Sequence, residues 1–395
     1  MYTFILDIAT TASRRFRTRI QYRCIKIRIE RARTSEEAMC RNTFCSEERD
    51  NISTLLEGLS EQERNDIHFA VFIAQTDPSV HFAYHEDWLH NLADEVLLYD
   101  LPKKKMEHVI ELEKTGNSRE KGLFDYTYML KSCYEQGAEH IAMFEDDIVA
   151  LDGWYHRAVA GLELAERQST LQKASMDCKL IQYPPSSTTK TNDPKVLYLR
   201  LFYTEEFLGW NSEEWRTYLS YSLLATAVLT IALILLRCIS RTAKKSMTPS
   251  LVLPIYAICL PLTILLFFAA GRTTVLSLPT GVNEMPRYGC CSQALVFPRS
   301  SALSIINLFQ DKKLGFVDSL IEEFADQNGG LRWALTPSVV QHIGRKSSKG
   351  DDFGTASKYS MSVAEKLWNF GFEENDGEEL RREHLEVIGK GIPPP

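Results

Sequence analysis

The sequence contains none of the short motifs that identify several common enzyme classes. No GxSxG, HExxH, GxxxxGK[ST] or GxGxxG pattern occurs in its 395 residues. Serine hydrolases with a nucleophile elbow, zinc proteases, P-loop nucleotide hydrolases and dinucleotide-binding enzymes therefore gain no support from motifs. An excess of basic residues is also missing, because the net charge is −7. A general nucleic-acid-binding role, which depends on positive charge, is not expected.

Zinc-ligand spacing is absent as well. No two of the nine cysteines are spaced as CxxC, so a structural zinc site has little support. Cysteines outside the apolar segments can form disulfides if their compartment is oxidising, but their spacing does not reveal the pairing. Asn51 opens an Asn-Ile-Ser sequon, which is usable for glycosylation only on a lumenal segment.

Charge is missing from two long apolar runs. Residues 218–236 and 249–270 contain no Asp, Glu, Lys or Arg, and each approaches the length needed to cross a bilayer core. Trp215 and Tyr218 stand at the start of the first run, where aromatic side chains favour the membrane interface. The alternative is a pair of helices buried in a soluble core. Uncharged runs of this length favour a transmembrane hairpin.

The loop at residues 237–248 sets the predicted orientation of this hairpin. It carries four basic residues and no acidic residue. Short loops rich in Lys and Arg stay in the cytosol, so both long flanks are expected on the lumenal side.

The soluble part shows an alternation of strands and helices. Strands are predicted at 68–74, 95–99 and 140–144, separated by helices near 86–93 and 120–136. Alternation at this spacing predicts an α/β fold with a parallel sheet. Further strands are predicted at 196–203, 293–298 and 332–336. The soluble domain thus begins before the hairpin and resumes after it.

Three consecutive acids, Glu145-Asp146-Asp147, end the apolar strand at 140–144. Ligands of parallel α/β sheets bind at the carboxyl ends of the strands. Asp147 is predicted to bind a hard divalent cation, Mn²⁺ or Mg²⁺, that neutralises a diphosphate leaving group. Asp146 and Glu145 are expected to hold the metal, the ribose of a nucleotide or the loop itself. The alternative is a solvated loop or the acidic start of a helix.

Other residues complete the predicted site. His342 is the candidate further metal ligand, since neutral imidazole suits Mn²⁺, and residues 345–349 could engage phosphate oxygens. Asp318 is the candidate base for an acceptor hydroxyl, with Glu322 as a second choice. An N-cap role for Asp318 in the helix at 319–325 is the alternative.

A nucleotide-binding group is predicted around the first strand. Gln75 and Thr76 follow that strand, and Lys121 and Asp125 lie one helical turn apart. All four could contact a nucleotide. A surface ion pair is the alternative for Lys121 and Asp125.

Several segments together resemble a known family. FAVFIAQTDP, KGLFDYTYMLKSC, AMFEDDIVALDGW, RWALTPSVVQHIG and LYLRLFYTEEFLGW, the last followed by the hairpin, resemble post-GPI attachment to proteins factor four. The resemblance covers about residues 66–350. It implies a GT-A-like, Rossmann-like glycosyltransferase fold with an inserted transmembrane hairpin. It also implies transfer of N-acetylgalactosamine from a UDP-sugar to the first mannose of a GPI-anchor glycan, in the Golgi.

The expected organisation follows from these observations. An N-terminal basic and helical segment (1–65) comes first. The catalytic domain follows in two parts (66–216 and 271–350), which the hairpin (217–270) separates. A C-terminal segment (351–395) ends the sequence. The expected activity is inverting and metal-dependent, on a lumenal domain of a multi-pass Golgi membrane protein. Two alternatives stay open: an N-acetylglucosaminyl- or galactosyltransferase acting on other glycans, and a membrane scaffold without activity.

Overall fold

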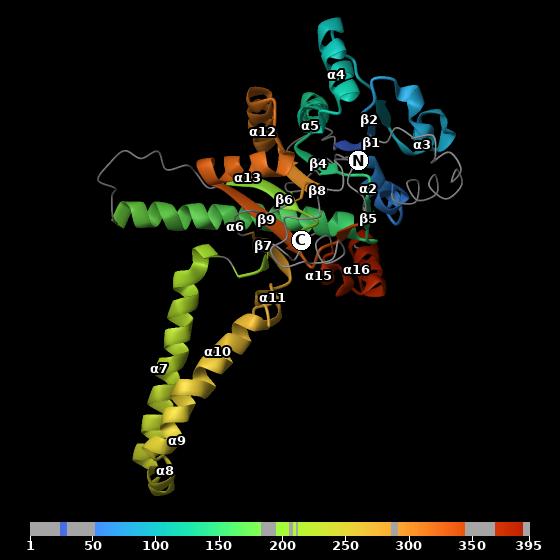
Figure 1. Ribbon diagram of the computed structural model, residues 1–395. Helices are drawn as coiled ribbons and strands as arrows, with labels where there is room; N and C mark the ends of the chain where they lie inside the picture. Colours follow the sequence, from blue (N-terminus) through green and yellow to red (C-terminus); the bar gives the residue numbers. More distant parts are fainter. Residues whose placement is uncertain are drawn as a thin grey trace, which may run out of the picture. The chain divides into compact units, whose positions relative to one another are not determined.

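The chain consists of two compact units. The computed structural model describes residues 24–29, 52–182, 195–204, 208–210, 212–285, 291–343 and 368–389, with only the backbone described at 24–29 and 175–182. One unit is formed by Met1–Thr204 together with Pro279–Pro395, and the other by Glu205–Leu278. The first contains the sheet, and the second contains the long apolar helices (Figure 1).

A mixed sheet forms the centre of the first unit. Among the described residues it has eight strands, in the order β3-β2-β1-β4-β8-β6-β9-β7. These strands are β1 (Cys24–Ile29), β2 (His68–Ile73), β3 (Glu95–Leu97), β4 (His140–Phe144), β6 (Lys195–Arg200), β7 (Gly281–Glu284), β8 (Ala294–Pro298) and β9 (Gly330–Thr336). β3, β2, β1 and β4 are mutually parallel. The prediction of a parallel sheet is confirmed for these strands, but β8 is antiparallel to β4 and β6, and β7 is antiparallel to β9.

The basic N-terminal stretch supplies a central strand that the sequence analysis did not predict. β1 lies between β2 and β4, with Cys24 opposite His68 on one side and Ile141 on the other. Central parallel strands usually form continuous apolar runs. Two basic residues interrupt the apolar residues of this strand, CIKIRI, which is why its composition did not indicate a strand.

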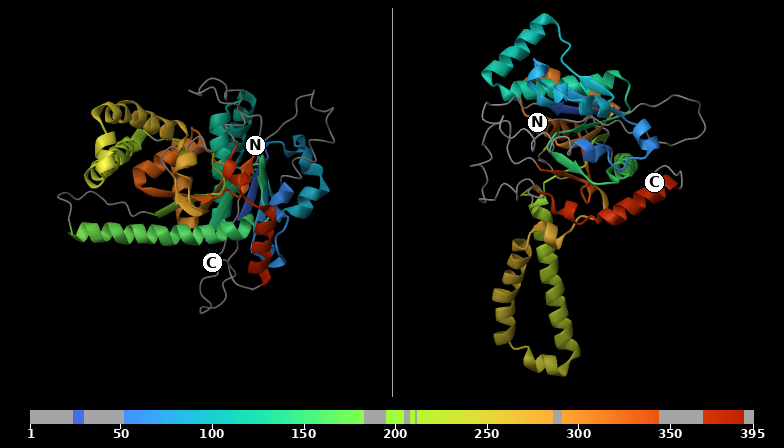
Figure 2. Two further views of the ribbon diagram at one scale, coloured as in Figure 1. Left: turned by 90° about the horizontal axis from the view of Figure 1, so that it is seen from below. Right: turned by 90° about the vertical axis from the view of Figure 1, so that its right-hand side faces the viewer.

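Helices cover both faces of the sheet. One face packs on α5 (Ser118–Glu135), α12 (Arg299–Lys312) and α13 (Val317–Asn328), and the other on α6 (Trp154–Gln182) (Figures 1 and 2). Asn117 caps the first turn of α5, because its side chain accepts a hydrogen bond from the amide of Glu120. Further helices described in this unit include α2 (Glu61–Asn65), α3 (Asp87–Leu92), α4 (Lys103–Thr115), α15 (Phe370–Glu373) and α16 (Gly377–Gly389), with short 3₁₀ turns at Pro78–Val80 and Phe82–His85. Both faces of β4 are therefore buried, and all five of its residues are inaccessible.

A second, two-stranded sheet follows directly after β4. β5 (Ile148–Ala150) pairs in antiparallel fashion with β10 (Val340–His342). The sequence analysis predicted neither strand, because three residues are too few to show a hydrophobic period. This β5–β10 ribbon positions the candidate site.

The second unit is a helical hairpin (Figure 2). Among the described residues, two segments are long and apolar enough to cross a membrane: Trp215–Ile239, which is α7, and Pro249–Ala269. The latter comprises α9 (Pro249–Pro254), a π-helical turn (Ile255–Cys259) and α10 (Leu260–Ala269), and α8 (Arg241–Ser246) connects the two segments. Neither segment is buried, which does not fit the alternative of two helices in a soluble core.

Contacts between side chains close this hairpin at two levels. The Trp210 indole donates to the Phe268 carbonyl oxygen at 2.8 Å, and the Tyr218 ring meets the Phe268 ring edge-on. Deeper in the hairpin, the Tyr256 hydroxyl donates to Thr230 Oγ1 at 2.7 Å. The π-helical turn follows Pro254, whose missing N–H disrupts the regular helix ladder.

Candidate functional site

The acidic motif begins where β4 ends, and its first residue points into the protein. Glu145 is 2% exposed, and its carboxylate accepts a hydrogen bond from Ser292 Oγ at 2.8 Å. Its amide donates to the carbonyl oxygen of Gln293 at 2.9 Å. Glu145 thus fixes the segment that leads into β8, which corresponds to the loop-holding role among those predicted for it.

Asp147 and His342, both predicted metal ligands, are brought together by the β5–β10 ribbon. Ile148, the first residue of β5, lies opposite His342, and the amide of Ile343 donates to the Asp147 carbonyl oxygen at 2.8 Å. The Asp147 Oδ2 atom is consequently 2.9 Å from the His342 Nε2 atom. His342 is the last residue of β10.

The pair is electrostatically coupled. Burial opposes ionisation of Asp147, but the nearby His342 imidazolium and its hydrogen bond outweigh burial and lower the pKa of the carboxyl group. Burial likewise opposes protonation of His342, yet Asp147, with smaller contributions from Glu145 and Asp146, raises the pKa of the imidazole. Each partner stabilises the charged form of the other. A neutral His342 keeps the hydrogen bond to Asp147 only in the tautomer that carries its proton on Nε2.

Two atoms of the pair fit a cation site. Asp147 Oδ1 and His342 Nδ1 are buried without hydrogen-bond partners in the part of the chain that the structure describes. An unpartnered carboxylate oxygen is a ligand that hard cations take. No group of three or more His, Cys, Asp or Glu side chains with metal-binding geometry occurs among the described residues. The pair therefore offers at most the Asp147 carboxylate and, once His342 loses a proton, one imidazole nitrogen, so phosphate oxygens and water would complete the coordination of an ion. Asp146, half-buried between Glu145 and Asp147, does not complete a three-ligand group.

The predicted nucleotide-contacting residues form one cluster after β2. Lys121 Nζ donates to the Ala74 carbonyl oxygen at 2.7 Å and pairs with Asp125 Oδ2 at 2.9 Å. Gln75 and Thr76 follow Ala74 in the chain, and the Thr76 amide donates to Glu113 Oε1 at 3.0 Å. Lys121 is 9% exposed and Asp125 0%, so the alternative of a surface ion pair is wrong. The buried pair holds the turn at the carboxyl end of β2.

The two predicted base candidates have different surroundings. Glu322 is buried, with its carboxylate 2.8 Å from Arg200 Nη2 and 2.7 Å from Arg332 Nε. Asp318 is half-buried in the first turn of α13, where it accepts from the amide of Ser319 at 2.7 Å. Phe316 occupies the N-cap position, so the N-cap alternative for Asp318 is wrong.

The phenol of Tyr126 is affected by the charges of both Asp318 and Glu145. Its hydroxyl is buried without a hydrogen-bond partner among the described residues. Burial is the main reason that the pKa of Tyr126 is raised, and the negative charges of Glu145 and Asp318 raise it further. Both carboxylates therefore lie within electrostatic range of one phenol on α5.

Sequence reasoning missed the residues that support Glu145. Ser292 contacts Glu145 across 147 positions, and Arg200 Nη1 donates to the Cys291 carbonyl oxygen at 2.6 Å. No local pattern signals contacts this distant. Cys133 and Cys291 are each disulfide-bonded. The sequon at Asn51 and the basic residues at 345–349 lie outside the described residues.

One of the three comparisons with known proteins gives a match. The family model described as GPI-N-acetylgalactosamine transferase PGAP4 matches residues 49–341. Comparison with curated proteins and with solved structures gives no match. The match includes the sheet from β2 onward, the acidic motif and the inserted hairpin. The molecule is thus of the glycosyltransferase class. The chain belongs to the GPI-N-acetylgalactosamine transferase PGAP4 family, since the model covers well over half of it.

Proposed function

We propose that the protein transfers N-acetylgalactosamine from UDP-N-acetylgalactosamine to a mannose of a GPI-anchor glycan, with inversion at the anomeric carbon. The observation that carries the proposal is the Asp147–His342 pair beside the carboxyl end of β4, in a chain of this family. Ligand sites in α/β proteins lie at that end of the strands. A mixed sheet with a small ribbon next to the acidic motif supports a GT-A-like arrangement.

Asp147 and His342 would hold the divalent cation. The unpartnered Asp147 Oδ1 atom and the His342 imidazole offer one oxygen and one nitrogen ligand, a combination that suits Mn²⁺ and admits Mg²⁺. The ion, when bound, neutralises negative charge on a diphosphate leaving group. Glu145, anchored by Ser292, keeps the end of β4 in register so that Asp147 faces His342.

Asp318 is the proposed base. In direct displacement, the acceptor hydroxyl oxygen forms a bond to the anomeric carbon while the bond from that carbon to the diphosphate oxygen breaks. The hydroxyl proton passes to a carboxylate, and UDP leaves with the bonding electrons. Asp318 is half-buried and shares the surroundings of Tyr126 with Glu145, whereas Glu322 is occupied by two guanidinium groups. Proton transfer by one positioned carboxylate suffices for an inverting enzyme.

The turn after β2 is the proposed nucleotide contact. Gln75 and Thr76 stand at the carboxyl end of β2, next in the sheet to β1 and second from β4. The buried Lys121–Asp125 pair holds this turn through the Ala74 carbonyl oxygen. In this role Lys121 and Asp125 position Gln75 and Thr76, so their effect on the nucleotide is indirect.

The proposed location is the Golgi lumen, with the hairpin in the membrane. The basic loop between α7 and α9 supports a cytosolic position for that loop, which leaves both flanks in the lumen. Disulfide-bonded Cys133 and Cys291 support an oxidising compartment. A hairpin inserted in the catalytic chain would keep the enzyme at the bilayer, where a lipid-anchored acceptor resides.

Calorimetric titration of the purified full-length protein with UDP tests the donor site. We expect binding with Mn²⁺ and its loss in EDTA or in Asp147→Asn. Asp311→Asn, at an exposed acid on α12, is the matched control and should bind as wild type does. Transfer assays with UDP-N-acetylgalactosamine, UDP-N-acetylglucosamine and UDP-galactose then identify the sugar. Absence of UDP binding to wild type under every condition would contradict the proposal and favour a non-catalytic scaffold.

A further inference from the structure

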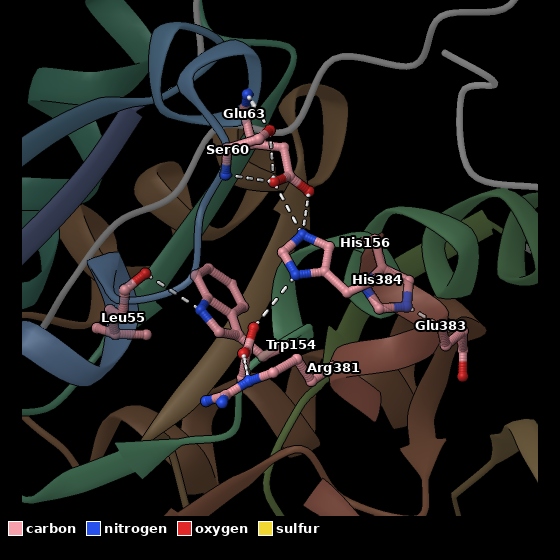
Figure 3. Close-up of polar contacts among 9 residues, drawn as sticks. Leu55, Ser60, Glu63, Trp154, His156, Arg381, Glu383 and His384 are labelled. Atoms are coloured by element: carbon pink, nitrogen blue, oxygen red, sulfur yellow. Dashed lines mark hydrogen bonds and ion pairs between the residues drawn. The ribbon is translucent and has the colours of Figure 1, made fainter. Parts of the chain in front are cut away.

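The C-terminal helix α16 carries a histidine that links three distant parts of the sheet unit (Figure 3). His384 is 2% exposed. Its Nε2 atom lies 2.9 Å from Glu63 Oε2, at the start of α2, and its Nδ1 atom lies 3.2 Å from Asp152 Oδ1, two residues after β5 ends. The match to the family model ends at residue 341, so this helix lies beyond it.

Both ring nitrogens of His384 therefore face carboxylates. A neutral imidazole carries one proton and can donate to only one acceptor, whereas an imidazolium donates to both. Hydrogen bonding to Glu63 is the largest cause that raises the pKa of His384, burial opposes it, and the charges of Glu63 and Asp152 add to the rise. Burial opposes ionisation of both carboxyl groups, but hydrogen bonds from His384 and Ser60 lower the pKa of Glu63, and hydrogen bonds from Arg381 and then His384 lower the pKa of Asp152. The contacts are thus complete only when His384 is protonated.

The other charged groups around His384 do not replace this proton. The His156 ring stacks on the His384 ring, with centroids 5.1 Å apart. Burial is the main cause that lowers the pKa of His156, so this second ring stays neutral at a pH where His384 is charged. Glu383 is engaged by His156 Nε2 at 3.0 Å and by Arg157 Nη2 at 2.6 Å. Arg381 donates to the other oxygen of Asp152 at 2.8 Å, and Glu57 and Glu378 act on Arg381 from a distance.

The C-terminal segment also holds the second strand of the ribbon. The Asn369 amide donates to Gln341 Oε1 at 3.1 Å, and Asn375 Nδ2 donates to the Ser338 carbonyl oxygen at 2.9 Å. Gln341 lies in β10 immediately before His342. The segment at 368–389 thus contacts the ribbon from both sides, near Asp152 after β5 and within β10.

Two glycines pack closely against Asp152 and His156. A Cβ atom added to Gly58 would lie 2.4 Å from Asp152 Oδ1, and one added to Gly153 would lie 2.8 Å from His156 Cε1. Asp152 lies two residues after the end of β5, and the first residue of β5 follows Asp147 directly, so the contacts of Asp152 anchor the chain close to the Asp147–His342 pair.

We propose that His384 is a positioning residue for the Asp147–His342 pair. Its protonated ring binds α16 to Glu63 and Asp152, and these contacts form a clasp. The clasp holds the β5–β10 ribbon in its ligand-binding geometry. The proposal rests on the function proposed above. The contribution of His384 to the free energy of unfolding is complete below the ordinary pKa of histidine. It is lost as the pH rises through the raised pKa that His384 has in the folded protein. The clasp is tightest in a mildly acidic compartment and loosens toward alkaline pH.

Hydrogen exchange measured by mass spectrometry on the full-length protein tests the clasp without requiring activity. After correction for intrinsic rates, the amides of β5 and β10 should exchange more slowly in wild type at about pH 6 than at about pH 8. His384→Gln should exchange fast at both. Glu63→Gln keeps the capping box with Ser60, because Gln can replace Glu there, and should move the transition to lower pH. Arg382→Gln, at an exposed position on α16, should behave as wild type does.

Calorimetric titration with UDP and Mn²⁺ on the same variants tests the positioning role. At about pH 6, His384→Gln should bind about tenfold more weakly than Arg382→Gln, and at about pH 8 the two should converge. Wild-type exchange and affinity in His384→Gln at both pH values would overturn the proposal. If that variant does not fold, an unchanged pH profile in Glu63→Gln overturns it instead. If wild type shows the exchange profile but binds no UDP, the clasp exists without the proposed function, and the positioning role is overturned.

Discussion

His342 and His384 are both buried histidines that face carboxylates, yet they differ in how many of their polar atoms are used. His384 has an acceptor at each ring nitrogen, Glu63 at one and Asp152 at the other. His342 has Asp147 at Nε2 and no hydrogen-bond partner at Nδ1 among the described residues, and Asp147 Oδ1 is likewise unpartnered. Buried polar groups are normally satisfied. The contacts of His384, in which both ring nitrogens have partners, are therefore typical of a structural role. The Asp147–His342 pair, which has two unpartnered atoms, is typical of a ligand site.

Asp147→Asn removes the carboxylate of the Asp147–His342 pair and has the largest expected effect. The carboxamide is a poor ligand for a hard cation, so sugar transfer from UDP-N-acetylgalactosamine should fall by more than about 100-fold. The protein should remain folded by circular dichroism, because the site contributes little to the core. Full transfer activity in this variant would show that the pair is not a metal site.

Glu322→Ala breaks a buried ion network and should act on stability. It leaves the buried Arg200 guanidinium without its carboxylate and Arg332 with Asp326 alone, which costs about 3–5 kcal/mol of the free energy of unfolding. Denaturant unfolding measures this loss. The conservative Glu322→Gln separates the two roles considered for this residue. A loss of transfer at unchanged stability in Glu322→Gln would instead identify Glu322 as the base.

Gly58→Ala tests how firmly Asp152, one of the two carboxylates that contact His384, is held in place. Gly58 has a φ of 81°, and a Cβ atom there would collide with Asp152. The matched control is Gly137→Ala, where φ is 91° and no atom lies within 4 Å of the added Cβ. Both variants bear the cost of left-handed backbone, about 1 kcal/mol or more. Thermal unfolding should show a larger loss for Gly58→Ala, and equal losses would mean that Asp152 yields freely.

Tyr256→Phe removes a polar contact within the hairpin and has the smallest expected effect. The Tyr256–Thr230 hydrogen bond joins two apolar helices, and such bonds contribute about 0.6 kcal/mol on average inside membranes. Unfolding of the protein in detergent micelles should shift only slightly, while transfer activity stays at the wild-type level. A large loss of activity would show that the hairpin does more than hold the enzyme at the bilayer.

The parts of the fold that could be predicted are those with a local signal. The apolar runs and the strands at β2, β4 and β8 appear in composition alone. Strand β1 was missed because its basic residues interrupt the apolar pattern, and β5 and β10 because three residues form no period. The antiparallel placement of β8 was missed too, since strand direction depends on the path of the intervening chain rather than on the strand itself.

For the candidate site, the sequence by itself determined the residue types: an acidic triplet after a buried strand, an imidazole near a later strand, and an uncharged hairpin between them. Tertiary structure decided which of these residues meet. Asp147 and His342 are 195 positions apart, and a two-stranded ribbon brings them to 2.9 Å. Glu322 lies in a buried ion network, Asp318 is half-buried, and His384 of α16 contacts Asp152, two residues after β5 ends. The physical reason is that local preference fixes elements within a few residues, whereas the register between distant strands is fixed only when the whole core packs.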